Sequence, residues 1–110
     1  MRPEDWARLG AAMESEMPFP PPYQRIDVSG LAEPAVFDAD VAYHGDWTEG
    51  LAPLDTVAQV RIRPRWLKHR GRLVAPETVD CEAELIAALD RLDIAWSRDG
   101  DVIRVPAAQG

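Results

Sequence analysis

The sequence has little of several residue types, and each shortage excludes a class of protein. Only one of the 110 residues, Cys81, is a cysteine, so the chain cannot form an internal disulfide or a thiolate metal cage. We expect Cys81 to be buried as a small apolar residue. No apolar run reaches the roughly 20 residues that a helix needs to cross a bilayer. The first residues, 1–6, contain no apolar segment typical of a signal peptide, which predicts a soluble, cytoplasmic protein.

Motifs that carry catalysis are also absent. The chain has no glycine-rich phosphate loop, no nucleophile elbow and no paired zinc-ligand motif. Its two histidines, His44 and His69, fall in different expected loops and have no acid–base partner fixed by sequence. One short stretch offers oxygen and nitrogen ligands for a divalent cation: Asp38, Asp40, His44 and Asp46. Acids on an exposed face are normally just solvated, so we predict a protein that is not an enzyme and has no metal or cofactor.

Charge is abundant but unevenly distributed. The net charge is −7, yet positions 61–72 contain no acid and six cations: Arg61, Arg63, Arg65, Lys68, Arg70 and Arg72. The other residues carry six cations against 19 acids, a net charge of −13. Such a field repels nucleic acid over most of the surface and attracts a cationic partner, mainly by speeding the encounter.

Acids dominate the stretch before the basic segment, because no Lys or Arg lies between Arg25 and Arg61. An aromatic residue, Trp47, lies among these acids and offers an anchor for a partner, although it would equally suit the core. A negative field with an aromatic anchor is typical of a patch that recognises a basic protein surface. The predicted partner-binding residues are Asp38, Asp40, Asp46, Trp47, Glu49 and Asp55.

The basic segment allows a second interpretation. Its cations are interleaved with Trp66 and His69, which is the composition of a loop that follows phosphates and stacks on bases. The opposing interpretation is that these arginines alternate outward from a strand and balance the acidic remainder. The alternative function is therefore a nucleic-acid-associated regulator that uses the six cations from Arg61 to Arg72.

Helical and strand periods divide the first half of the chain. Helical spacing from Trp6 predicts an amphipathic helix that ends near Met17, because Pro18 pushes the residue before it out of the α region. Alternation predicts strands over residues 23–28, 36–44 and 58–63, with Asp38 and Asp40 on the outer face of the second.

The second half ends in a helix and a hairpin. Residues 66–72 are expected to be irregular, with a short edge piece at 73–74. A helix is predicted from an N-cap at Asp80 to Leu92, and a β-hairpin turns at Asp99-Gly100. The chain is expected to be one α+β domain over residues 1–106, with a loose tail at 107–110. Its small, mainly antiparallel sheet of four to five strands packs against two helices.

The proline-rich stretch PFPPPYQ, residues 18–24, has two possible roles. Its last residues, Pro20 to Tyr23, match the short Pro-Pro-x-Tyr pattern that aromatic-lined grooves bind in extended form. The preferred interpretation is a brace. Pro18 ends the helix, the next prolines hold an extended crossing at low entropic cost, and Phe19 and Tyr23 fix its ends to the core.

Several stretches together resemble a family of small bacterial proteins encoded beside polymorphic toxins: PFPPPYQ, GDW, RPRWLKHRGRLV and LIAALDRLDIAWSRDGDVIRV. The resemblance covers most of the chain and implies immunity, that is, binding and silencing a cognate toxin. No catalytic residues are implied. We therefore expect an immunity protein that occludes the active cleft of a toxin, and if the toxin is a nuclease, its basic substrate groove is the natural target.

Overall fold

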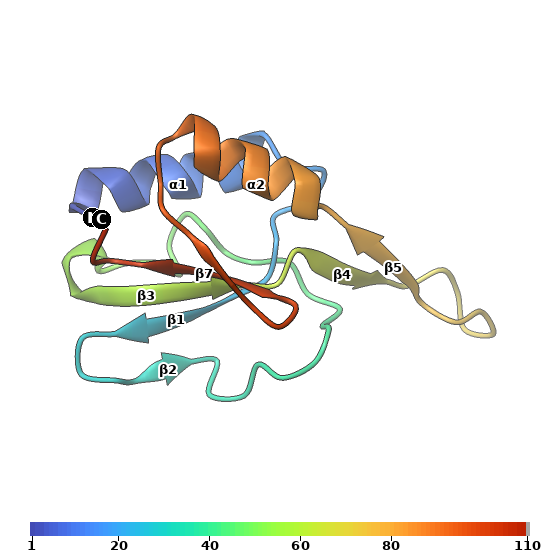
Figure 1. Cartoon of the computed structure of the whole chain (residues 1–110). Coiled ribbons are helices and arrows are strands. Elements are labelled where there is room, and N and C mark those ends of the chain that lie inside the picture. The colour runs from blue at the N-terminus through green and yellow to red at the C-terminus, as the bar shows by residue number, and fades with distance from the viewer. Residues whose placement is uncertain (110) are drawn as a thin grey trace.

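The computed structural model describes residues 1–109, which form two α-helices, one 3-10 turn and seven strands (Figure 1). In chain order these are α1 (Pro3–Ser15), β1 (Tyr23–Asp27), β2 (Ala32–Glu33), η1 (Leu54–Thr56), β3 (Val57–Ile62), β4 (Arg65–Lys68), β5 (Glu77–Asp80), α2 (Glu82–Arg91), β6 (Ser97–Asp99) and β7 (Val102–Pro106).

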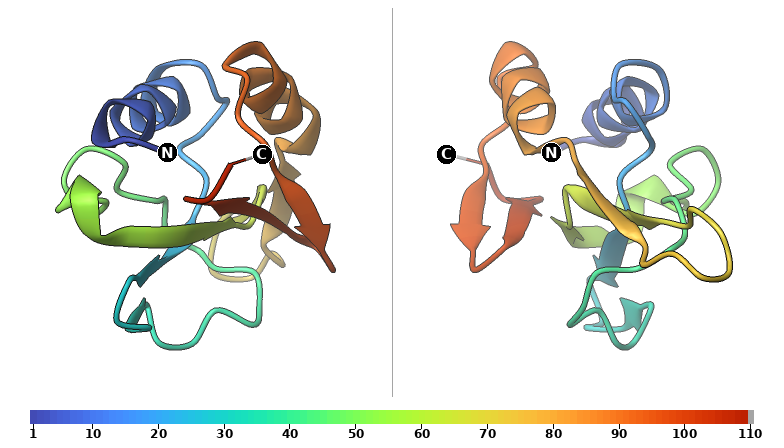
Figure 2. Two further views of the ribbon diagram at one scale, coloured as in Figure 1. Left: turned by 60° about the vertical axis from the view of Figure 1, so that its left-hand side comes forward. Right: turned by 90° about the vertical axis from the view of Figure 1, so that its right-hand side faces the viewer.

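Five of the strands form one antiparallel sheet in the order β2-β1-β3-β7-β6, and β4 and β5 pair as a separate ribbon. Both helices lie side by side on one face of the larger sheet, as the two views of Figure 2 show. The predicted α+β architecture is confirmed, and β6 and β7 form the expected C-terminal hairpin. No helix within residues 1–109 is long and apolar enough to cross a membrane.

The core lies between the two helices and the sheet. Each helix places an i, i+4 pair of apolar residues on its inner face, as expected for an amphipathic helix. The side chains with no exposure come from α1, β3, α2, β7 and the residue before α2: Leu9, Met13, Val60, Ile62, Cys81, Leu85, Leu89, Ile103 and Val105. Burial raises the pKa of the Cys81 thiol to about 12, so this cysteine is an apolar core residue, as predicted.

The proline-rich stretch is a buried brace between α1 and β1. Its carbonyl groups accept hydrogen bonds from three other segments, namely Gly45 N to Pro20 O (3.1 Å), Trp47 Nε1 to Pro21 O (2.8 Å) and Arg63 N to Pro22 O (3.0 Å). Pro21 and Pro22 are fully buried, while Phe19 and Tyr23 are 4% and 7% exposed. The brace interpretation is confirmed, and the Pro-Pro-x-Tyr match lies inside the folded protein.

Both helices begin and end close to the predicted positions. α1 ends at Ser15, two residues before the expected Met17, and Pro18 follows within one turn. At the start of α2 the capping residue is Cys81, but Asp80 Oδ1 accepts a hydrogen bond from the amide of Glu82 (2.8 Å). Asp80 therefore satisfies a free N–H group of the first turn, as an N-cap side chain does.

The strand expected over residues 36–44 is not present. Its alternation predicts that Phe37, Ala39, Val41 and Tyr43 face inward, but Phe37 is buried at 5% exposure, whereas Tyr43 is 48% exposed. Isolated hydrogen bonds hold the segment instead of a strand ladder: Arg63 donates to the carbonyl of Phe37 (2.7 Å), the Leu67 amide to that of Val41 (2.9 Å) and the Trp66 indole to that of Ala42 (3.0 Å). Two-residue alternation of apolar residues therefore also occurs in this irregular segment.

The basic stretch also differs from the expectation. Residues 65–68 form β4 where an irregular segment was expected, and they pair with β5, which was not expected. The short edge piece predicted at Leu73-Val74 lies instead in the loop that joins β4 to β5. This ribbon and its loop, residues 65–80, are called the arm below.

Candidate partner-binding groove and basic arm

The segment from Asp46 to Asp55 is called the acidic loop, and Asp46 holds its start in a turn. Its Oδ1 accepts hydrogen bonds from the amides of Thr48 and Glu49 (both 3.1 Å) and from the Thr48 hydroxyl (2.9 Å). The bond from the Glu49 amide, followed by that from the Thr48 hydroxyl, holds the pKa of Asp46 below its ordinary value. The carboxylate of Asp46 is therefore committed to the shape of the loop.

Trp47 is a core residue and not the exposed anchor that the predicted patch contained. Its side chain is 3% exposed, and its ring centroid lies 4.2 Å from that of Tyr23. Its backbone N–H donates to Glu14 Oε1 of α1 (2.9 Å), and its indole N–H donates to the brace. The core alternative is therefore correct, because the buried indole N–H has its own acceptor.

Arg25 of β1 fixes the far end of the same loop. Its guanidinium donates to the carbonyls of Leu51 (2.9 Å) and Pro53 (2.6 Å) and to the Thr56 hydroxyl (2.8 Å). The prediction from sequence missed this residue. A signal was present, because period-two alternation from the aromatic Tyr23 places Arg25 on the same inward face of β1.

A groove of about 310 Å³ runs between α1 and this fixed loop. Apolar side chains make up most of its wall: Trp6, Ala7, Ala11, Trp47, Leu51 and Leu54. Gly10 allows the helix to approach, because a Cβ atom there would lie 2.7 Å from the carbonyl oxygen of Trp47. Two exposed acids, Glu49 and Asp55, directly follow the wall residues Thr48 and Leu54 in sequence. Neither acid has an ion-pair partner within residues 1–109.

Asp38 and Asp40 are separate from this groove. Asp40 Oδ1 lies 3.2 Å from Arg65 Nε and 3.7 Å from Arg63 Nη1, and Asp101 completes the network at 3.0 Å from Arg65. Asp38 is exposed and lines another cavity, of about 440 Å³, together with charged residues of both signs: Arg61, Arg63, Asp99 and Asp101. The six predicted residues therefore do not form one patch.

The six predicted cations divide into two groups. Arg61, Arg63 and Arg65 form ion pairs with acids of the body, and Arg63 is only 4% exposed. Lys68, Arg70 and Arg72 lie at the end of the arm, are exposed and have no ion-pair partner within the described part of the chain. A nucleic-acid surface would thus have three available cations instead of six.

The residues considered for metal or acid–base chemistry do not converge. The ring of His44 packs against two aromatic rings, with centroids 4.3 Å from Trp66 and 6.0 Å from Phe19, whereas His69 is exposed in the arm loop. Among residues 1–109, no group of three or more His, Cys, Asp or Glu side chains is arranged to hold a metal ion.

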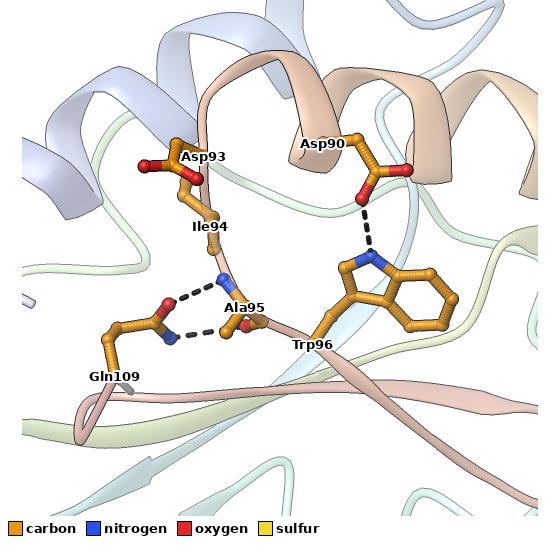
Figure 3. Close-up of a pocket in the computed structure, with 6 residues that line it drawn as sticks. All are labelled: Asp90, Asp93, Ile94, Ala95, Trp96 and Gln109. Carbon is orange, nitrogen blue, oxygen red and sulfur yellow. Dashed lines mark hydrogen bonds between the residues drawn. The ribbon is translucent and has the colours of Figure 1, made fainter.

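A cavity of about 610 Å³ lies where the turn after α2 meets the C-terminal segment (Figure 3). Its polar side chains bond to one another, since Trp96 Nε1 donates to Asp90 Oδ1 (3.0 Å) and the Gln109 amide exchanges two hydrogen bonds with the backbone of Ala95. The expected loose tail is thus attached to the body as far as Gln109, and Gly110 lies outside the described residues.

The fold and these surfaces define a small α+β protein with one helix-covered antiparallel sheet, an acid-flanked groove and a basic arm. The chain belongs to a family of unknown function, DUF6678, whose model matches residues 1–107. That description assigns no activity to its members. No curated protein and no solved structure matches the chain.

Proposed function

We propose that this protein is a cytoplasmic immunity protein that binds a cognate toxin and covers its active site without catalysing a reaction. The observation that supports the proposal best is the groove between α1 and the loop from Asp46 to Asp55. Its floor is mostly apolar, and directly after its wall residues Thr48 and Leu54 come two exposed acids, Glu49 and Asp55, that no cation of the described chain neutralises.

A fixed loop favours tight binding because little conformational entropy is lost on association. The loop is fixed at its start by Asp46 and Trp47 and at its end by Arg25. Apolar area contributes affinity, and the unpaired carboxylates attract a basic surface and speed the encounter. In a nuclease, these carboxylates would occupy positions that substrate phosphates otherwise take.

Our proposal assigns this role to fewer residues than the six predicted from sequence. Glu49 and Asp55 remain, with Asp46 as the residue that shapes the loop. Asp40 is compensated by two arginines, Trp47 is buried, and Asp38 lies at another cavity. Asp38 therefore serves as an internal control, because it is an exposed acid away from the groove.

The test starts with affinity capture from the native lysate, using the whole chain as bait, and asks whether co-expression protects cells from the captured protein. We expect the double substitution E49R/D55R to abolish protection and to slow association about tenfold or more at low salt. The matched control, D38R, should protect as the unmodified protein does.

Two results would contradict the proposal. The first is a captured protein that is not toxic, or whose toxicity co-expression leaves unchanged. The second is a toxin that binds E49R/D55R and D38R with the same salt-dependent association rate, which would mean that it uses another surface.

A further inference from the structure

The loop at the end of the arm combines positive charge with exposed apolar surface. Leu73 is 100% exposed and Val74 is 48% exposed. Three cations precede them in sequence, namely Lys68, Arg70 and Arg72, and no acid occurs between Lys68 and Glu77. A fully exposed leucine directly after these cations is unexplained by the fold, because it packs against nothing in the described protein. We call residues 68–76 the arm tip.

The arm points away from the helices and the larger sheet (Figure 1). Its direction is fixed at the base, where Cys81 N donates to Pro64 O (2.8 Å) and Leu67 N donates to Val41 O (2.9 Å). Four residue pairs of the antiparallel ribbon then carry the chain outward from this base. Since the arm tip is held away from the body, a surface that covers Leu73 has to belong to another molecule.

The body of the same protein carries the complementary surface. With three positive charges in the arm tip and a net charge of −7 for the whole chain, the remainder carries −10. Within that remainder, the groove beside α1 offers an apolar floor, and the residues that follow its wall residues Thr48 and Leu54 are Glu49 and Asp55, acids without an ion pair among residues 1–109. The arm tip, with apolar residues directly after cations, therefore matches this groove both in apolar surface and in the sign of its charge.

We propose that the arm tip of one molecule docks into the groove of a second copy. Leu73 contacts the apolar floor, and Arg70 and Arg72 lie against Glu49 and Asp55. If each molecule gives its arm to the other, the contact closes as a two-fold dimer; if the exchange is not mutual, it continues as an open chain. The groove is then covered in the assembly, so a toxin has to displace the arm to bind there.

Nucleic acid fits the arm tip less well than a second copy does. Three of the six cations in the basic segment are engaged by Asp40, Asp99 and Asp101. A body with a net charge of −10 repels a phosphate backbone, whereas it attracts the arm tip of another molecule. The inference goes beyond the proposed function, since it requires only the purified chain and no toxin.

Sedimentation of the purified full chain tests self-association directly. At low salt we expect a concentration-dependent dimer or higher assembly that dissociates in about 1 M salt, where exposed charges are screened. The substitution L73D should raise the dissociation constant about tenfold or more, because it places a carboxylate next to the acids of the groove. The matched control is D38R, which should assemble as the unmodified chain does.

A charge exchange makes the test specific for these two surfaces. R70E/R72E gives a molecule whose arm and groove are both acidic, and E49R/D55R gives one in which both are basic. Each variant alone should stay monomeric, and an equimolar mixture should assemble again, because both arm–groove contacts regain opposite charges. Circular dichroism checks that each variant is folded.

Two outcomes would overturn the inference. The first is a failure to assemble: the unmodified protein stays monomeric at low salt and high concentration, or the mixture of the two charge-exchange variants does not assemble. The other is a monomer whose arm tip binds a fluorescent single-stranded oligonucleotide or phosphatidylserine vesicles, with binding lost in R70E/R72E. In that case the occupant is a nucleic acid or a membrane surface. Neither outcome bears on toxin capture, so the two proposals can fail independently.

Discussion

Two buried arginines are stabilised in different ways. The guanidinium of Arg25 donates to two carbonyls and a hydroxyl, and it forms no ion pair with a carboxylate of residues 1–109. That of Arg63 lies between Asp40 and Asp101, donates to the carbonyl of Phe37, and sits 5.1 Å above the ring of that residue. The Arg63 side chain is only 4% exposed, so water cannot easily take the place of the guanidinium if its ion pairs and hydrogen bond are lost.

We expect the substitution R63M to lower the free energy of unfolding by about 2 kcal/mol. The two carboxylates left behind are partly exposed, which keeps the loss below that of a fully buried pair. Urea unfolding measures the effect. The control is R91M, which removes an exposed ion pair with Glu16 and should cost less than about 1 kcal/mol. Equal losses for the two variants would contradict the structural role of Arg63.

The turn at Asp46 predicts a dependence of stability on pH. Folding lowers the pKa of this carboxyl from its ordinary 3.8, so the ionised group stabilises the fold above that pH. The contribution is lost as the pH falls through the folded-state pKa. D46N should therefore unfold at lower urea than the unmodified protein at pH 7, and the difference should shrink as the pH falls below about 4.

A pH series of urea midpoints checks this expectation. D38N is the matched control, because Asp38 accepts no hydrogen bond from residues 1–109 and its removal should change the midpoint little at any pH. A difference between D46N and the unmodified protein that stays constant down to acidic pH would show that the carboxylate charge does not stabilise the turn.

At the scale of elements, α1 and the acidic loop depend on a close approach. Alanine is favoured over glycine inside a helix by about 1 kcal/mol, which alone would make G10A stabilising. A Cβ atom at Gly10 would, however, lie 2.7 Å from the carbonyl oxygen of Trp47 and push the helix away from the loop. The steric term should win, because the loop is fixed at both ends.

We therefore expect G10A to lower the free energy of unfolding by about 1–3 kcal/mol, as overpacking does in well-packed cores. Its neighbour Ala11 is exposed in the same helix, so A11G should cost about 1 kcal/mol through helix propensity alone. Thermal melts of both variants give the comparison. If G10A proved more stable than the unmodified protein, the loop would have to be free to move.

Periodicity was a reliable guide where an element buries one face. Both helices, β1, β3 and β7 have an apolar stripe or alternation that packs on the core, and all of them were predicted. Strand β6 is exposed at all three residues and was predicted from the Asp99-Gly100 turn instead. The arm was not predicted because a two-stranded ribbon away from the core has no face to bury. β5, with the sequence ETVD, is mostly exposed and polar, and its pairing with β4 joins residues on either side of an eight-residue loop.

The candidate site was predicted only in part, for a related reason. The acids were grouped by closeness in sequence, whereas the fold sends Asp40 to the arginines that follow β3 and Asp38 to another cavity. Glu49 and Asp55 stay in the loop that forms one wall of the groove. Trp47 can be buried because its indole N–H donates to the carbonyl of Pro21, a residue 26 positions earlier. Such long-range contacts leave no local pattern.

At the scale of the whole molecule, the charge segregation seen in sequence survives folding in altered form. Arg61, Arg63 and Arg65 form ion pairs with acids of the body. The other three cations, Lys68, Arg70 and Arg72, are exposed at the end of the arm. The result is an acidic body with a small positive end, a dipolar arrangement that orients molecules before they touch. Salt should therefore weaken any association of this protein through its rate of formation.

The proline brace has a consequence for how the molecule opens. Prolines have no N–H of their own, but the carbonyls of this stretch hold the amide protons of Gly45 and Arg63 and the indole proton of Trp47. These three protons belong to residues that are distant in sequence. Exchange of any one of them requires the same buried brace to move, so none of them can exchange by a local opening of its own segment. Hydrogen exchange by NMR should find all three slow and equally protected, with one opening free energy close to that of global unfolding.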